Sequence, residues 1–230
     1  MIILATMKKY LIAVLAAALC MVPAFAQEDL PDKDWAHFGR YQQANAGLSF
    51  KPVAVFMGDS ITDGWYSQDP VFFDSHRFAG RGISGEVTSH MLVRFRRDVI
   101  ELQPKYVVIL AGINDIARNN GYISIENTFG NIVSMCELAK AHKIKPVLCT
   151  LVPSDHIVWR PALGDVTPLV SALNEKIRQY AKEKHIRLVD YAKLLSDENG
   201  KILDGVTRDA VHPVIEGYKM MEEAVLKALK

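Results

Sequence analysis

The sequence predicts an α/β protein built on a parallel β-sheet, and three observations support this fold class. Five short apolar runs have the length of strands, and segments with a helical spacing of apolar residues separate them. Strands and helices alternate along the chain, as in right-handed βαβ units. The apolar runs are continuous rather than alternating, so we expect strands that are buried on both faces, as in a parallel sheet.

The strand pattern is strongest in the third of the five apolar runs. It consists of six apolar residues, rich in β-branched side chains, without an interruption. The second run is the weakest, because it contains glycine and arginine. The expected strands are Val53–Met57, Phe78–Ile83, Tyr106–Ala111, Pro146–Val152 and Ile186–Val189.

Four amphipathic helices are expected around these strands, with apolar residues recurring every three or four positions over 91–102, 125–139, 168–180 and 218–229. Ser124 suits the N-cap of the second helix, and Thr167 and Pro168 suit the N-cap and first position of the third. Residues 27–50 are expected to be a helical extension that packs on the domain formed by residues 51–230. Its apolar residues are Trp35, Phe38, Tyr41 and Leu48.

The composition excludes several classes of protein. The chain has 230 residues, of which 50% are hydrophobic and 23% charged, so a collagen, a coiled coil and a long disordered chain are excluded. A formal net charge of +1 gives no basic surplus for phosphates, and we expect no nucleic-acid partner. The seven His and three Cys have neither metal-finger spacing nor a disulfide framework, and no metal is expected in the catalytic site.

The first 26 residues have the pattern of a secretory signal peptide. Lys8 and Lys9 precede an apolar run over 10–22, which is shorter than the roughly 20 residues of a membrane span. An A-x-A cleavage signal ends at Ala26, so we expect a periplasmic or secreted bacterial protein without a stable membrane span. Cys20 leaves a lipoprotein open as the alternative, although the residues before it form a poor lipobox.

Two cysteines, Cys136 and Cys149, follow this segment, one in a helical pattern and one in a strand pattern. We expect both to be buried free thiols that behave as small hydrophobic side chains.

Polar residues follow the expected strands where a parallel α/β sheet binds its ligands. Three segments follow the first three strands and are Gly58-Asp59-Ser60-Ile61-Thr62, Gly82-Ile83-Ser84-Gly85-Glu86 and Gly112-Ile113-Asn114-Asp115. The fourth precedes the last helix and is Asp209-Ala210-Val211-His212-Pro213. Because the carboxyl ends of parallel strands meet at one edge of a sheet, we expect these segments to converge there.

In this order the four segments resemble the sequence blocks of the SGNH (GDSL) hydrolase family, from Lys51 to the C-terminus. The resemblance implies a three-layer α/β/α, flavodoxin-like fold with a five-stranded parallel sheet. It also implies a serine esterase or lipase that needs no cofactor. Within that family the chain looks closest to small lysophospholipase-like and acetylhydrolase-like enzymes.

The resemblance assigns a role to each polar residue. Ser60 is the expected nucleophile, His212 its general base, and Asp209 the carboxylate that orients the imidazole. The backbone N–H groups of Ser60 and Gly85 and the side-chain amide of Asn114 are the implied oxyanion-hole donors. Asp59 and Asp115 are interpreted as structural hydrogen-bonding residues.

The substrate pocket is less defined by the sequence. Trp65, Tyr66, Phe72 and Phe73 either form a wall of the cleft or pack in the core, and of these four we assign Trp65 to substrate binding. Trp159 and Arg160 follow the fourth strand on the same edge, where they can stack on a sugar ring or meet an anionic leaving group.

We expect hydrolysis of short acyl esters, such as acetyl esters of carbohydrates or small alcohols. A lysophospholipase or thioesterase for longer chains and a non-catalytic carbohydrate-binding relative remain alternatives. The G-x-G-x-x-G match over Gly80–Gly85 follows the second strand rather than the first, so it does not predict a dinucleotide site. The oligomeric state stays open.

Overall fold

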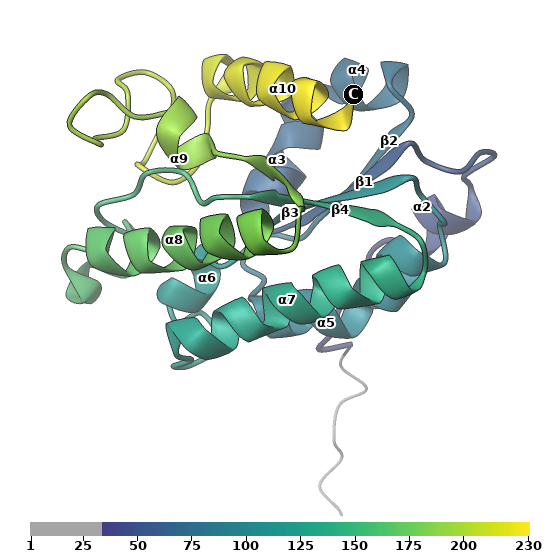
Figure 1. Ribbon diagram of the computed structural model, residues 1–230, viewed down its shortest axis with the longest axis horizontal. Helices are drawn as coiled ribbons and strands as arrows, with labels where there is room; N and C mark the ends of the chain where they lie inside the picture. The colour runs from purple at the N-terminus through teal and green to yellow at the C-terminus, as the bar shows by residue number, and fades with distance from the viewer. Residues whose placement is uncertain (1–33) are drawn as a thin grey trace, which may run out of the picture. The chain divides into compact units, whose positions relative to one another are not determined.

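Five parallel strands form the middle layer of the computed structural model, which describes residues 34–230 (Figure 1). They lie in the order β2-β1-β3-β4-β5, which confirms the predicted flavodoxin-like sheet. Their bounds are β1 (Ala54–Gly58), β2 (Phe78–Gly82), β3 (Tyr106–Leu110), β4 (Lys145–Cys149) and β5 (Arg187–Val189). The expected signal peptide lies outside the described residues.

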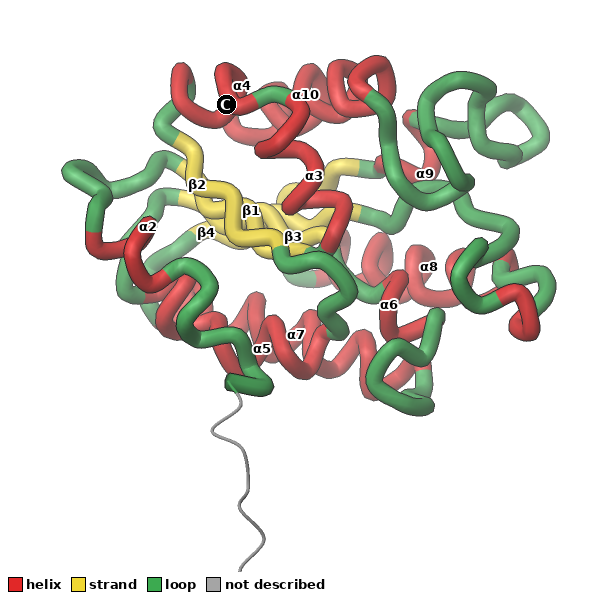
Figure 2. The backbone as a smooth tube through the Cα atoms, turned by 180° about the vertical axis from the view of Figure 1, so that it is seen from behind, coloured by secondary structure: helices red, strands yellow, loops and turns green. Residues whose placement is uncertain are grey.

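Helices cover both faces of the sheet, so the fold has the three predicted layers (Figures 1 and 2). One face carries α3 (Ser60–Gln68), α4 (Pro70–Ser75), α9 (Tyr191–Leu194) and α10 (Ile215–Leu229). The other carries α5 (Thr88–Phe95), α7 (Ile125–Ala141) and α8 (Thr167–Glu183). A π-helical turn η1 (Arg96–Ile100) continues α5, while α6 (Ile113–Ile116) and the 3₁₀ turn η2 (Pro161–Leu163) lie in loops. None of the described helices is both long enough and apolar enough to cross a membrane.

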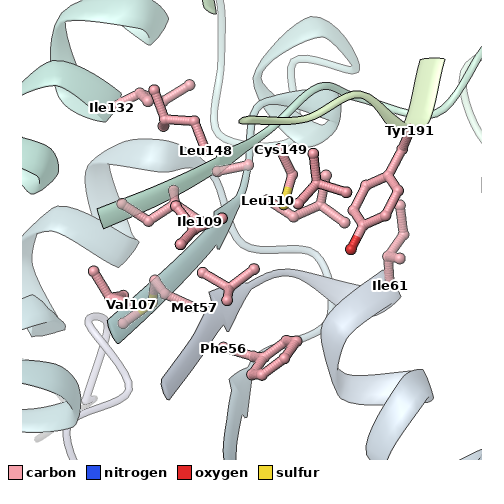
Figure 3. Close-up of a cluster of buried hydrophobic side chains, with 14 of the residues drawn as sticks. Phe56, Met57, Ile61, Val107, Ile109, Leu110, Ile132, Leu148, Cys149 and Tyr191 are labelled. Atoms are coloured by element: carbon pink, nitrogen blue, oxygen red, sulfur yellow. The ribbon is translucent and has the colours of Figure 1, made fainter. Parts of the chain in front are cut away.

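The central strands β1 and β3 are buried along their whole length, as their continuous apolar sequences predict. Side chains of β1, β3 and β4 pack between the two helical layers, with Met57, Ile109 and Leu148 among them (Figure 3). Cys136 and Cys149 are buried free thiols, as predicted. Burial raises the pKa of the Cys136 thiol to about 12 and raises that of Cys149 further.

The structure confirms the predicted N-cap of α7 but not that of α8. The Ser124 side chain accepts a hydrogen bond from the backbone N–H of Asn127 at 3.2 Å, which confirms it as the N-cap of α7. The N-cap of α8 is Val166 instead of Thr167. The reason is that the Asp165 carboxylate already accepts the Thr167 backbone N–H, at 2.9 Å, so the helical turn begins one residue earlier.

The expected amphipathic helix with Trp35, Phe38, Tyr41 and Leu48 on its apolar face is not formed in the described part of residues 27–50. Only α2 (Gln42–Ala46) is helical, it has no buried residue, and Trp35 is 59% exposed. His37 has a φ of 55°, a left-handed conformation that interrupts a helix. Polar contacts hold the segment instead, because the Asn45 amide bonds to Asp98 at 2.9 Å and accepts from Arg81 at 2.8 Å.

Helix α3 lies close to the ends of β1 and β2 because both strands end in glycine. A Cβ atom at Gly82 would lie 2.3 Å from the backbone nitrogen of Asp63 in α3, and one at Gly58 would lie 2.9 Å from the Cβ of Thr62 in the same helix. Real Cβ atoms do not approach other atoms so closely. The two glycines therefore set the distance between the sheet and the N-terminus of α3, where Ser60 lies.

We expect Gly82→Ala to lower the free energy of unfolding by about 1–3 kcal/mol, because backbone must move to admit the methyl group. The matched control is Gly130→Ala in α7, where nothing lies within 4 Å of the added Cβ. This change should raise stability by about 0.5–1 kcal/mol, since alanine favours a helix. Urea unfolding of both variants measures the difference, and equal effects would contradict the steric argument.

Candidate active site

Ser60 lies at the carboxyl end of β1, in the first turn of α3. The preceding residue, Asp59, is the N-cap of this helix, and its carboxylate accepts the Ile61 backbone N–H at 3.0 Å. The sequence interpretation of Asp59 as a structural hydrogen-bonding residue is confirmed. The cap fixes the direction in which α3 leaves the sheet, and the half-buried Ser60 is its first residue.

The structure brings Ser60, His212 and Asp209 together from opposite ends of the domain. Ser60 Oγ lies 2.8 Å from His212 Nε2, and His212 Nδ1 lies 2.8 Å from Asp209 Oδ2. Both ring nitrogens are therefore engaged, one by a hydroxyl and the other by a carboxylate. The His212 side chain is 14% exposed, so the ring lies partly in the protein while one edge remains open to solvent.

The loop before α10 is closed by local contacts that fix the imidazole. Asp209 Oδ1 accepts the backbone N–H of His212 at 2.7 Å, and the Arg208 N–H donates to the His212 carbonyl at 3.0 Å. Ala210 takes a left-handed φ of 60°, and Ser154 Oγ donates to its carbonyl at 2.8 Å. These contacts leave the loop little freedom to carry His212 away from Ser60.

The environment of Asp209 favours its charged form. Burial by itself raises the pKa of this carboxyl, but hydrogen bonds from the backbone N–H and the ring of His212 outweigh burial, and the pKa is below its ordinary value. A negative charge at Asp209 is the state that stabilises a protonated His212 ring.

Asp59 has the opposite environment, although it neighbours Ser60. Its carboxyl is fully buried, and this burial, together with the negative charges of the nearby Asp115 and Glu86, raises its pKa to about 7. Oδ2 has no hydrogen-bond partner among residues 34–230. The two carboxyls near Ser60 therefore differ in charge state, with Asp209 ionised at neutral pH and Asp59 partly protonated.

Gly85 and Asn114 lie beyond the ends of β2 and β3, on either side of β1 in the sheet order. Gly85 has a φ of 81°, a conformation that favours glycine. Asn114 is 1% exposed, and its amide nitrogen donates to the Glu86 carbonyl at 3.0 Å. An amide nitrogen carries two hydrogens, so one remains for a ligand. The adjacent Asp115 accepts the Thr88 N–H at 2.9 Å, which confirms its structural interpretation.

Asn119 joins these residues, and the sequence analysis missed it. Its amide nitrogen donates to Asn114 Oδ1 at 2.7 Å and to the Gly85 carbonyl at 3.3 Å. Its oxygen accepts the indole N–H of Trp159 at 3.0 Å. The indole N–H of Trp159 requires the Asn119 oxygen as its acceptor, so it fixes the orientation of the Asn119 amide. The Asn119 NH₂ group in turn requires the Asn114 oxygen as its acceptor, which turns the Asn114 NH₂ group toward the Glu86 carbonyl. No sequence signal distinguishes Asn119 from an ordinary loop asparagine.

Trp159 and Arg160 lie at the same edge of the sheet as predicted. The indole of Trp159 is half-buried, and its centroid lies 5.5 Å from that of the His212 ring. Arg160 is exposed, and its guanidinium donates to the Ala117 carbonyl at 3.3 Å. The loop after β4 therefore places an aromatic face directly beside the imidazole.

The expectation that Trp65 lines a substrate cleft is wrong. Its side chain is 1% exposed, and its indole N–H donates to buried Glu222 at 3.1 Å. Phe72 and Phe73 are likewise buried and pack against it and against Phe56. Of the two readings of this aromatic segment, core packing is the one that the structure supports for these three residues.

One cavity among the described residues contains Ser154 but does not border Ser60 or His212. Its volume is about 400 Å³, and it lies between α8 and the segment after α9, lined by residues such as Ser154, Asn174 and Ile202. This cavity is separate from the Ser60 site. Its lining residue Ser154 contacts the loop that carries His212 through the hydrogen bond to the Ala210 carbonyl.

Two solved structures from Bacteroides are similar to the whole described fold. A GDSL-like lipase from Bacteroides thetaiotaomicron VPI-5482 is 43% identical, covers 84% of this chain and 97% of its own, and superposes with a TM-score of 0.80. Another structure, from Bacteroides fragilis NCTC 9343, is 45% identical, covers 86% and 98% of the two chains, and has a TM-score of 0.82.

A curated relative, the lipoprotein YqeF of Bacillus subtilis (strain 168), is 36% identical over 141 residues. This match spans 54% of the present chain and 58% of the relative. The model of the GDSL-like lipase/acylhydrolase family matches residues 56–220, which include Ser60, Gly85, Asn114, Asp209 and His212. With most of the chain covered by the family model and the same fold in the Bacteroides structures, the chain belongs to the GDSL-like lipase/acylhydrolase family, the SGNH hydrolases.

Proposed function

We propose that this protein is a serine esterase that hydrolyses carboxylic esters through an acyl-enzyme. The observation that carries the proposal is the continuous chain of contacts from Ser60 through His212 to Asp209, with both distances at 2.8 Å. A serine hydroxyl is a poor nucleophile unless a base lies within hydrogen-bond reach, and here that base is itself held by a carboxylate.

The reaction proceeds in two steps. The Ser60 oxygen attacks the ester carbonyl while His212 takes its proton, and the tetrahedral intermediate then expels the alcohol, which receives that proton. Water next attacks the acyl-serine and gives its proton to His212, which returns this proton to the Ser60 oxygen as the carboxylic acid leaves. Asp209 stabilises the imidazolium in both steps and does not itself take the proton.

The oxyanion of each intermediate needs donors that are already in place. We assign this role to the backbone N–H groups of Ser60 and Gly85 and to the second amide hydrogen of Asn114. The assignment is supported by the positions of these residues beyond the ends of neighbouring strands β1, β2 and β3. Donors fixed by the fold stabilise the developing charge without reorganisation.

We propose short acyl esters, such as acetyl esters of carbohydrates or small alcohols, as the substrates. Two observations support this choice. Trp65, Phe72 and Phe73 are committed to the core and cannot supply an apolar wall for a long acyl chain. Trp159 presents an aromatic ring beside His212, and Arg160 is exposed next to it, a pair suited to a sugar ring and an anionic group.

We also propose that the protein is exported to the periplasm or beyond, as the pattern of residues 1–26 predicts. The similarity to a relative that is named as a lipoprotein supports export. Soluble and lipid-anchored forms differ in whether Cys20 is retained, which mass spectrometry of the mature N-terminus determines.

We expect Ser60→Ala and His212→Ala each to lower kcat by roughly 10⁴-fold or more, because the nucleophile and its base act together in the same step. For the same reason the double variant should be little worse than either single variant. Hydrolysis of p-nitrophenyl acetate measures the rates, with circular dichroism as the control for folding. Two losses that multiply in the double variant would contradict the assignment.

A fluorophosphonate probe separates an esterase from a carbohydrate-binding relative. The wild type should react covalently at Ser60, and Ser60→Ala should not react. An unlabelled wild type that still binds a glycan would overturn the catalytic proposal.

The acyl preference is tested with p-nitrophenyl acetate and palmitate at matched concentrations. We expect the acetate to have the higher kcat/KM, since three of the four aromatic side chains in the segment after Ser60 are buried and only Tyr66 is exposed. Faster palmitate turnover would replace our substrate class by the lysophospholipase-like or thioesterase-like alternative.

Asn119 is expected to act as a positioning residue for Asn114. Asn119→Asp keeps the shape and the acceptor for Trp159, but it removes the donor to Asn114 Oδ1. We expect kcat to fall about 10-fold to 100-fold with little change in KM, as for a misplaced catalytic group. Asn114→Ala should cost about 10²–10³ in kcat.

Exposed Asn127→Ala in α7 is the matched control for Asn119→Asp and should keep the wild-type rate. Trp159→Phe, which keeps the ring and removes the indole N–H, should show the same selective loss in kcat. A pure KM effect in Asn119→Asp would assign it to substrate binding instead.

A further inference from the structure

A second group of chemically active side chains lies in the described part of the chain, apart from Ser60, His212 and Asp209. His37, Glu86 and His90 each offer one ligand atom, and the three atoms lie within 4.8 Å of one another. They come from the N-terminal segment, the turn after β2 and helix α5. Two imidazoles and one carboxylate are a ligand set that suits zinc and similar divalent ions.

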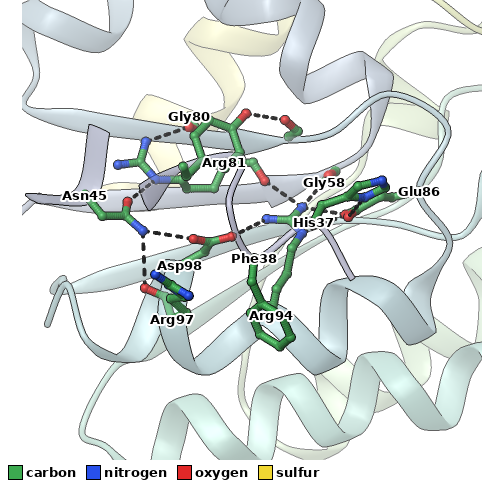
Figure 4. A network of polar contacts seen from close by, with 12 residues as sticks. His37, Phe38, Asn45, Gly58, Gly80, Arg81, Glu86, Arg94, Arg97 and Asp98 are labelled. Carbon is green, nitrogen blue, oxygen red and sulfur yellow. Dashed lines mark hydrogen bonds and ion pairs between the residues drawn. The ribbon is translucent and has the colours of Figure 1, made fainter. Parts of the chain in front are cut away.

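The carboxylate of Glu86 is already oriented. Its Oε2 is held by the buried guanidinium of Arg94, whose Nη2 lies 2.6 Å away. Its Oε1 points instead to His37 Nδ1, at 3.0 Å (Figure 4). Arg94 also pairs with Asp98 at 2.9 Å, so its positive charge is shared between two carboxylates. Glu86 therefore keeps negative charge for a second cation on the side of Oε1.

His90 provides the observation that points to a ligand. Its Nδ1 is buried and has no hydrogen-bond partner among residues 34–230. Its Nε2 lies 3.2 Å from the side-chain amide of Asn120. An imidazole that binds a metal through one nitrogen typically donates from the other to a nearby oxygen. The Asn120 amide can present its oxygen there by a rotation of its end group.

We propose that Glu86 and one ring nitrogen each of His37 and His90 bind a Zn²⁺ ion. Zinc holds such ligands at about 2.0–2.2 Å, which places tetrahedral neighbours roughly 3.3 Å apart. The separation of 3.0 Å between Glu86 Oε1 and His37 Nδ1 is close to this value. The ring centroids of His37 and His90 are 6.2 Å apart, so a small closure completes the set. Water takes the fourth position, because the His37 side chain is 44% exposed.

The ion would be a brace and not a catalytic metal. It would tie the N-terminal segment, at His37, to the turn that contains Gly85 and to helix α5. The Glu86 carbonyl accepts the hydrogen bond of Asn114, so the residue that binds the ion also contacts the proposed oxyanion hole. This inference is independent of the proposed esterase function, because it concerns a different set of side chains.

The test is zinc binding to the chelator-treated protein, purified without a polyhistidine tag. Isothermal titration should give one Zn²⁺ per chain, and added Zn²⁺ should raise the Tm as a ligand of the folded state does. His37→Asn keeps a donor for Glu86, and His90→Gln keeps a polar side chain of similar reach, so both should fold. Each should weaken zinc binding at least 10-fold and abolish the Tm rise.

His142→Ala, at the exposed C-terminus of α7, is the matched control and should bind zinc as the wild type does. Co²⁺ gives a second readout, since tetrahedral coordination produces intense visible absorption that both variants should lack. No saturable binding by the wild type would overturn the proposal, as would binding that survives in both variants. Equal loss in His142→Ala would also overturn it, because it would indicate nonspecific histidine binding.

Discussion

The arrangement of the site depends on one buried cation, Arg94. Its side chain is fully buried, and it pairs with Glu86 and Asp98 while donating to the strand-end carbonyls of Gly58 and Arg81 (Figure 4). Burying an unpaired charge costs several kcal/mol, so the groups around a buried guanidinium must stay where they satisfy it. Arg94 therefore holds the turn after β2 in a fixed position relative to the ends of β1 and β2. Ser60 follows the end of β1 and Gly85 lies in that turn, so their relative position is fixed as well.

The topology of the sheet then brings the remaining groups to the same edge. The chain leaves β1 toward β2 on one side and later returns to β3 on the other, so β1 lies between them at the switch point. Ser60 follows β1 and Asn114 follows β3. His212 arrives from the loop before α10 and completes the set. Residues more than 150 positions apart thus meet because parallel strands share one carboxyl edge.

The sequence predicted the sheet well, because fully buried strands need uninterrupted apolar residues. The clearest error is at the end of β4, which stops at Cys149 although the apolar run continues to Val152. Residues 150–152 are buried but lie outside the strand. The Thr150 N–H makes the last backbone bond to Val189, at 3.1 Å, and the next N–H, that of Leu151, bonds to a side chain of α8 instead. Burial without strand pairing has the same apolar signature, so composition could not locate this boundary.

The site residues were accessible to sequence analysis only where a motif marked them. Ser60, Asp209 and His212 stand in recognisable segments, and the structure places them in contact. Asn119 has no such mark, since its importance lies in contacts with Asn114, five residues before it, and with two distant segments. Trp65 was misplaced for a simpler reason. It follows Ile61 by four residues in α3, so both share the face that packs on the core.

The two buried thiols have a practical consequence. Cys136 lies in α7 and Cys149 at the end of β4, with 0% and 1% exposure. Neither sulfur can meet an alkylating reagent unless its layer separates from the sheet, and their raised pKa values keep them as unreactive thiols in the closed state. The chain thus contains two native reporters of core opening, one in the helical layer and one in the sheet, at positions that require no engineered label.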